Sequence, residues 1–147
     1  MINHYFQISS GYSEVTELIV KLHNLFMKNG INSQDRSELE ICLVEALNNV
    51  VKHSYDTEPG NEIFLEVNFD EDSATFKIID SGNSRTDFSK PSLEFDPNDI
   101  ANLPEGGMGL YIIDKLMDKT SYTTERGKNI FTMTKNFQHK LCFGINS

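Results

Sequence analysis

The segment 39–55, LEICLVEALNNVVKHSY, combines two patterns that together restrict how the chain can fold. Its apolar residues recur at the spacing of an amphipathic helix packed against a core: Leu39, Leu43, Ala46, Leu47 and Val50. Along the edge of that face, Glu45, Asn49 and His53 follow at intervals of four residues, which stacks a carboxylate, an amide and an imidazole in one stripe. A carboxylate beside an apolar face is costly unless a cation, a phosphate or a proton donor offsets the cost. The segment therefore indicates a ligand site, although solvated side chains and a helix-end histidine fit the same spacing.

The composition is that of one globular domain. With 147 residues, 38% of them hydrophobic and 24% charged, the chain is long enough to bury a core without disulfides or metal. The net charge of −9 disfavours a nucleic acid partner, because the phosphate backbone is also anionic, whereas a basic protein surface fits. Cys42, at the head of the polar stripe, and Cys142 are far apart in the sequence, do not make a C-x-x-C pair and have no neighbouring histidine at metal-ligand spacing. We therefore expect two free thiols in a reducing cytoplasm. We find no signal-peptide pattern and no apolar run as long as a membrane span, so we expect a soluble cytoplasmic protein without membrane contact.

The remaining periodicities predict a layered fold. Strands are expected at 3–8, 62–69, 74–80, 121–125 and 130–137, with the turn RGKN between the last two. One helix is expected between Ser13 and Gly30, and the helix that contains 39–55 is expected to be capped by Asn32 or Ser33. The predicted fold class is an α/β two-layer sandwich, with a mixed, mostly antiparallel sheet of about five strands and three helices on one face.

Asp80 ends a predicted strand in an unusual position. Because side chains alternate along a strand, Asp80 is expected to point the same way as Phe76 and Ile78, into the helix layer. An aspartate placed there needs a partner. Gly82 follows two residues later, and a glycine lets a planar ligand approach the backbone closely.

A glycine-rich turn provides the third candidate element. Residues 81–106 have no convincing periodicity, and a loop of that length in a compact domain is typical of a lid or a binding loop. Gly106, Gly107 and Gly109 then precede an apolar helix. Exposed backbone N–H groups at such a helix start can bind an anion, although glycines at a helix start also serve tight packing alone.

Taken together, these motifs resemble those of the GHKL (Bergerat-fold) ATPases. The segments that carry the resemblance keep the order and spacing of that family over residues 3–137: VEALNNVVKHSY, IIDSGNSRTDF, PEGGMGLYIIDKLMD and IFTMTK. Within the superfamily the chain is most similar to the anti-sigma factor serine/threonine kinases, the stand-alone partner-switching kinases of bacteria. The P-loop signature and the HRD and DFG signatures of other kinases are absent from the sequence.

The resemblance implies a catalytic role and an adenine site. Glu45 would be the general base, and Asn49 would hold Mg²⁺ beside the nucleotide. Asp80 would bind the adenine amino group, and Gly82 would leave room for the base. Thr132 would support the adenine pocket through its hydroxyl or a water, although a threonine at this position also fits plain strand propensity.

The resemblance also implies how the ATP phosphates are held. The glycine turn would cradle them with the residues Gly106, Gly107, Met108, Gly109 and Leu110. His53 and Lys52, near the end of the helix that carries Glu45, would approach the phosphates as well. Lys52 fits equally well as a solvated charge at a helix end.

Two functions follow from these expectations. The first is an ATP-dependent serine/threonine protein kinase that transfers the γ-phosphate to a hydroxyl of a small anti-sigma factor antagonist, and that regulates a sigma factor by partner switching. The alternative is a non-catalytic ATP- or ADP-binding module that switches partners without phosphorylating them.

Residues 1–147 are expected to form one such domain, with a lid at 81–106. The tail at 138–147 is expected either to fray or to dock through Leu141 and Phe143, and a homodimer is expected by analogy with the family. A histidine-kinase domain would need an upstream dimerising hairpin, and only about a dozen residues precede the first helix.

Overall fold

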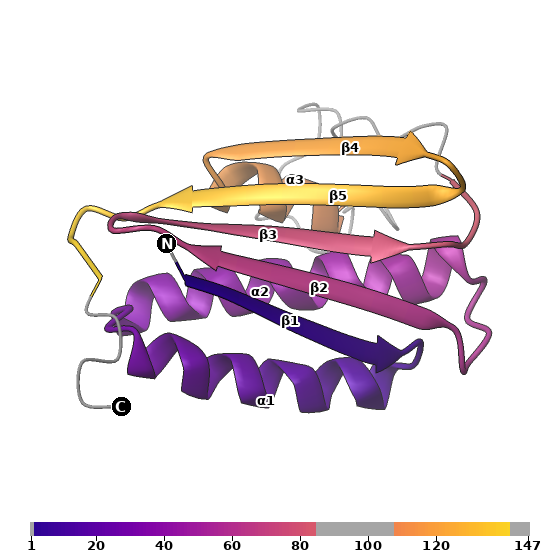
Figure 1. Ribbon diagram of the computed structural model, residues 1–147, viewed down its shortest axis with the longest axis horizontal. Helices are drawn as coiled ribbons and strands as arrows, with labels where there is room; N and C mark the ends of the chain where they lie inside the picture. The colour runs from indigo at the N-terminus through magenta and orange to yellow at the C-terminus, as the bar shows by residue number, and fades with distance from the viewer. Residues whose placement is uncertain (1, 85–107, 142–147) are drawn as a thin grey trace, which may run out of the picture.

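The computed structural model describes residues 2–84 and 108–141, whose elements are arranged in two layers (Figure 1). The described strands make one sheet with the order β1-β2-β3-β5-β4. Their bounds are β1 Ile2–Ser9, β2 Glu62–Phe69, β3 Ser73–Asp80, β4 Lys119–Glu125 and β5 Lys128–Asn136. The helices cover one face of this sheet: α1 Tyr12–Lys28, α2 Ser33–Asn49, the short π-helix η1 Val50–Ser54 and α3 Met108–Leu116.

This arrangement confirms the predicted two-layer sandwich with five strands and three α-helices on one face. It corrects one detail, because every pairing between the described strands is antiparallel, so the sheet is not mixed. The reason is that β4 takes the outer edge of the sheet. The tight β4–β5 hairpin then folds β5 back against β3 in the antiparallel direction.

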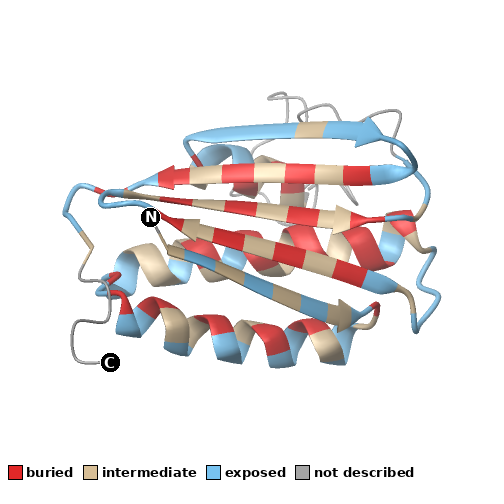
Figure 2. Ribbon diagram, in the orientation of Figure 1, coloured by how far each residue is buried: buried red, intermediate tan, exposed pale blue. Residues whose placement is uncertain are grey.

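The core lies between the sheet and the helices. Along β2 every second residue is buried, and along β3 and β5 the same alternation holds, as the red bands in Figure 2 show. On α1 the buried residues are spaced by three or four positions: Val15, Leu18, Leu22 and Phe26. Phe26 packs edge-on against Phe69 and Phe76, with ring centroids 6.3 and 5.9 Å away. These ring pairs join the helix layer to the middle of the sheet.

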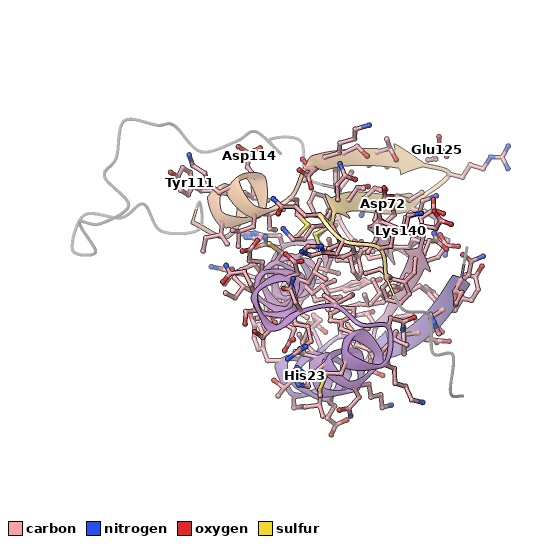
Figure 3. All side chains as sticks on the ribbon, turned by 90° about the vertical axis from the view of Figure 1, so that its left-hand side faces the viewer. His23, Asp72, Tyr111, Asp114, Glu125 and Lys140 are labelled. Carbon is pink, nitrogen blue, oxygen red and sulfur yellow. The ribbon has the colours of Figure 1, made fainter. Side chains whose placement is uncertain are left out.

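The two long helices are held side by side by polar contacts at their surface. His23 of α1, labelled within the helix layer in Figure 3, pairs through Nδ1 with Glu40 Oε2 of α2 at 3.0 Å. At the start of α2, the side chain of Asn32 accepts a hydrogen bond from the Asp35 backbone N–H at 2.8 Å. Of the two predicted caps, Asn32 and Ser33, Asn32 is therefore the N-cap of α2.

A π-helical turn interrupts the helix predicted over 39–55. α2 ends at Asn49, and η1 continues it with a wider turn in which the Tyr55 N–H donates to the Val50 carbonyl five residues earlier, at 3.2 Å. The regular spacing on which the predicted polar stripe depends therefore ends at Asn49. As a result Ser54 is buried, while His53 is half-buried.

The β4–β5 hairpin is tighter than expected. Arg126 and Gly127 have φ values of 51° and 77°, which is the combination of a two-residue turn between antiparallel strands. Lys128 and Asn129, expected in the turn, therefore belong to β5 and pair with Glu125 and Thr124. This correction decides which β5 residues face the helices.

The described part of the tail is docked. The Leu141 backbone N–H donates to the Glu71 carbonyl at 2.6 Å, and the Leu141 side chain packs against the core. Phe143 and most of the predicted lid at 81–106 lie outside the described residues. Among the described helices, none combines the length and the apolar character of a membrane span.

Candidate nucleotide-binding site

A pocket lies where α2, η1, α3 and the adjacent strands meet. It contains about 330 Å³ of empty space, counting the part that is open to solvent. Its lining residues are Ala46, Asn49, Val50, Ser54, Asp80, Leu110, Ile113, Tyr122 and Phe131. Three of the predicted site residues, Asn49, Asp80 and Leu110, therefore come together from three separate elements.

Asp80 is the polar centre of this pocket. It is only 3% exposed, and its carboxylate accepts three hydrogen bonds from described residues. Oδ1 accepts from the Gly82 backbone N–H at 2.9 Å and from Asn129 Nδ2 at 2.8 Å, while Oδ2 accepts from Ser54 Oγ at 3.2 Å. The predicted inward orientation of Asp80 is confirmed, and its partners explain how a buried carboxylate is tolerated.

Asn129 and Ser54 are site residues that the sequence reasoning missed. Asn129 stands opposite Asp80 in the β3–β5 register, and its amide also donates to the Gly82 and Asn83 carbonyls at 3.1 and 3.3 Å. The available signal was the period of two on β5, which groups Asn129 with buried Phe131 and Met133 once the two-residue turn is recognised. Ser54 had no such signal, because the π-helical turn brings it inward.

Gly82 lets two segments of the chain pack closely. A Cβ at this position would overlap the backbone carbonyl of Ser54 and stand 2.9 Å from the Tyr55 ring. The Asn83 N–H donates to the same Ser54 carbonyl at 2.7 Å. The glycine thus lets the end of β3 pack directly against the end of η1.

Tyr55 fastens the same two chain segments together. Its hydroxyl donates to the Glu62 carbonyl at 2.7 Å and accepts from the Ser81 N–H at 2.9 Å. Burial of the ring raises the pKa of this phenol above its ordinary value, and the nearby negative charge of Asp80 adds to the effect. The loop that follows Asp80 is therefore held on both sides, by Tyr55 and by Asn129.

Glu45 meets the glycine turn. The half-buried Glu45 on α2 faces Gly109 in the first turn of α3, where an added Cβ would lie 2.5 Å from Glu45 Oε2. The next residue, Leu110, is buried and lines the pocket. The start of α3 thus lies beside both the carboxylate and the pocket, and the first backbone N–H groups of a helix have no partner within the helix.

The other predicted phosphate-site residues do not line the pocket or lie outside the described part of the chain. Lys52 is exposed on η1, and His53 beside it is half-buried. Met108 is the first residue of α3, whereas Gly106 and Gly107 lie outside the described residues.

The prediction that Thr132 supports the adenine pocket is wrong. Thr132 pairs with Lys77 and Ser121 in the sheet, one residue out of phase with the buried Phe131, and so lies on the face away from the helices. Because side chains alternate along a strand, Thr132 cannot reach the pocket that Phe131 lines.

Asn49 is a pocket residue that could hold a metal bound with a nucleotide. No three or more His, Cys, Asp or Glu side chains gather as a metal site within residues 2–84 and 108–141. At phosphoryl-transfer sites Mg²⁺ is held by one or two protein oxygens together with phosphates and water. The side-chain amide of half-buried Asn49, on the pocket wall, provides one such oxygen.

Cys42 does not belong to the polar stripe. It is fully buried in the core, on the side of α2 that faces the sheet layer together with Leu43 and Leu39. Burial raises the pKa of its thiol to about 12, well above the ordinary value of 9.0. The thiol therefore behaves as a small apolar side chain.

Comparison with known proteins finds a family and relatives that match most of the chain. The family model described as "Histidine kinase-like ATPase domain" matches residues 8–135. A serine-protein kinase RsbW of Staphylococcus aureus is 34% identical over 135 residues, covering 88% of this chain and 83% of the relative. A serine-protein kinase RsbW of Bacillus cereus is 32% identical over 117 residues, covering 77% and 71%.

A solved structure shares the fold. The crystal structure of the RsbU and RsbW domains of a Mycobacterium tuberculosis protein superposes with a TM-score of 0.64 at 12% identity, covering 96% of this chain and 33% of that one. This likeness concerns the fold alone, whereas the family model and the two kinases match the sequence over most of its length. The chain belongs to the histidine kinase-like ATPase family and, within it, to the group of the serine-protein kinases RsbW.

Proposed function

We propose that this protein is an ATP-dependent serine/threonine protein kinase of the anti-sigma factor type. It transfers the γ-phosphate of ATP to a hydroxyl of a small antagonist protein and regulates a sigma factor by partner switching. The observation that carries the proposal is that Asn49, Asp80 and Leu110 line one pocket, with Glu45 against Gly109 beside it. Membership of an ATPase family supports ATP as the nucleotide, and the names of the two kinase relatives support protein phosphorylation.

Asp80 and the apolar lining of the pocket suit it to a purine base. Among the described residues, Asp80 Oδ2 accepts one hydrogen bond, from Ser54, which leaves a second lone-pair site for an exocyclic amino group. The rest of the lining is largely apolar and includes Ala46, Ile113 and Phe131. An apolar slot with one oriented polar group is the usual design of a small-molecule site.

Asn49, Glu45 and the start of α3 suit the same site to phosphates and to the transfer step. Mg·ATP would supply the phosphoryl group and the charge neutralisation that this chemistry needs. Asn49 would hold the metal, and the first-turn N–H groups of α3 would receive phosphate oxygens. Glu45 would take the proton from the attacking hydroxyl, a role for which it has to stand next to the phosphates. Its contact with the start of α3 supports that position.

The partners follow from the same assignment. We propose an anti-sigma factor antagonist as the phosphate acceptor, a sigma factor as the second partner, and a homodimer as the working form, in the cytoplasm. The net charge of −9 supports a partner that presents a basic surface.

Nucleotide binding is tested by thermal unfolding with Mg·ADP and Mg·ATP, and with each nucleotide in excess EDTA. A ligand present at about 100 times its Kd stabilises the folded state by about 2.7 kcal/mol, which raises the Tm of a domain of this size by about 5–10 °C. We expect that increase with magnesium and a smaller one in EDTA. No increase with either nucleotide would refute the nucleotide site.

Catalysis is tested by single-turnover transfer from γ-labelled ATP to a purified anti-sigma factor antagonist. Glu45→Gln should slow transfer by about 10²–10⁴ while leaving ADP affinity unchanged, because the amide keeps the shape and loses the basicity. Glu17→Gln, on the exposed side of α1, is the matched control and should transfer at the wild-type rate. A wild-type protein that binds ATP but labels no antagonist would favour the non-catalytic module.

A further inference from the structure

Asn129 donates one of the hydrogen bonds that the Asp80 carboxylate accepts. The residue is 1% exposed and comes from β5, whereas Asp80 comes from β3 directly opposite. The Asn129 amide is oriented by Thr124, whose Oγ1 donates to Asn129 Oδ1 at 3.0 Å. With its oxygen occupied in this way, Asn129 must turn its N–H groups toward Asp80 and the carbonyls of the following loop.

The remaining capacity of the Asp80 carboxylate can be counted. A carboxylate oxygen has two lone-pair sites. Oδ1 already receives the Gly82 N–H at 2.9 Å and Asn129 Nδ2 at 2.8 Å, so it is saturated. Oδ2 receives Ser54 Oγ at 3.2 Å among the described residues and keeps one site. In this pocket Asp80 is therefore a single-site acceptor, although a free carboxylate would offer two parallel oxygens.

This count distinguishes the two common purines. Adenine presents one exocyclic amino group, which needs one acceptor site, whereas guanine presents N1–H and its 2-amino group as a parallel pair that needs both oxygens of a carboxylate. A guanine bound here would leave one donor buried without a partner, a loss that polar sites use for discrimination.

We infer that Asn129 is a positioning residue that makes the pocket select adenine over guanine nucleotides, by occupying the Asp80 oxygen that a guanine would need. The inference rests on the proposed nucleotide site. Asn129 acts through Asp80 and does not touch the base, so its effect is on the ratio of two affinities. A merely structural role would weaken adenine and guanine nucleotides to the same extent.

A pair of isosteric variants isolates the hydrogen bond. Asn129→Thr keeps one hydroxyl donor at this position, whereas Asn129→Val has the shape of threonine without a donor. Calorimetric titrations with Mg·ADP and Mg·GDP measure the Kd ratio for each protein. We expect the wild type and Asn129→Thr to prefer ADP strongly, and Asn129→Val to lose about tenfold of that preference, the change expected for one hydrogen bond.

A second pair of variants tests the same inference without altering β5. Thr124→Val removes the donor that orients the Asn129 amide and should also reduce the preference for ADP, even if Asn129→Val does not fold. Thr123→Val, the neighbouring residue on the opposite face of β4, should keep the wild-type ratio.

The outcomes separate the inference from the proposed function. Unchanged ADP:GDP ratios in Asn129→Val and Thr124→Val, with tight ADP binding by the wild type, would overturn the role of Asn129 and leave the kinase assignment standing. A wild type that binds neither nucleotide would overturn both.

Discussion

Glu45 on α2 lies directly against Gly109 in the first turn of α3, where an added Cβ would stand 2.5 Å from Glu45 Oε2. No side chain therefore separates the carboxylate from the backbone of that turn. The two residues are far apart in the sequence, yet together they join the proposed general base to the N–H groups proposed to hold phosphates. The contact makes the glycine a requirement of the site, because any larger residue would move the carboxylate.

Gly109→Ala should impair catalysis more than folding. The new methyl group meets the flexible end of Glu45, which can rotate away, and alanine is favoured over glycine within a helix by about 1 kcal/mol. Misplacing a catalytic group by about 1 Å can cost about 100-fold in rate. We expect such a loss in single-turnover transfer, with a Tm close to that of the wild type. Transfer at the wild-type rate would contradict the role given to Glu45.

Gly82→Ala should do the reverse and destabilise the fold. Here the methyl group meets the Ser54 carbonyl, which belongs to the backbone and already accepts the Asn83 N–H. Because neither segment can rotate away, we expect a loss of about 2–3 kcal/mol, or about 4–12 °C in Tm. Ser81→Ala changes an exposed side chain one residue earlier and should unfold near the wild-type temperature. Equal Tm values for the two variants would show that this backbone contact is not tight.

The ion pair between Lys135 and Glu38 should make stability depend on acid pH. Lys135 Nζ, almost fully buried, donates to Glu38 Oε1 at 2.9 Å and to the Leu116 carbonyl at 3.1 Å. Hydrogen bonds from Lys135 and Gln34 lower the pKa of Glu38 below its ordinary value of 4.5. The folded state thus favours the carboxylate, and this stabilisation is complete above pH 4.5 and lost as the pH falls through the lower, folded pKa.

Lys135→Met should therefore reduce the free energy of unfolding by about 2–3 kcal/mol at pH 7, and by less at pH 3. Urea unfolding at both pH values measures the difference. Lys140→Met breaks an exposed pair with Glu71 and should have almost no effect. A loss of the same size at both pH values would mean that Lys135 stabilises the fold by packing alone.

Cys42 should make stability depend on alkaline pH. Its folded pKa of about 12 is above the ordinary value of 9.0, so the folded state favours the neutral thiol and loses this stabilisation as the pH rises above 9. The slope from this one group is about 1.4 kcal/mol per pH unit. Cys42→Ala should remove that slope, so the stability difference between wild type and variant should shrink from pH 8 to pH 10.5. A constant difference would show that Cys42 titrates normally.

Much of the site follows from local periodicity. Glu45 and Asn49 lie in the same α-helix, so a spacing of four residues is sufficient to place them on one side of α2. Asp80 lies on a strand whose buried residues alternate, so its inward orientation follows from the same period as that of Phe76 and Ile78. These placements depend only on residues within one element.

The errors arose where the position depends on two elements. Thr132 is one residue out of phase, because the phase of β5 is set by the two-residue turn at Arg126 and Gly127. The packing of Gly82 against Ser54 could not be predicted either, because it is the π-helical turn that brings Ser54 to the end of β3.

The sequence by itself determined the type of each element, the side of each helix and strand that is buried, and the set of chemical groups available for nucleotide binding. Only the tertiary structure decided which of those groups meet: Asn129 with Asp80, Ser54 with Gly82, and Glu45 with Gly109. The physical reason is that a period of two or 3.6 residues orients side chains within one element. Contacts between elements depend on strand register, turn type and helix winding. A change of one residue in any of these brings a side chain to a different neighbour or to the other face.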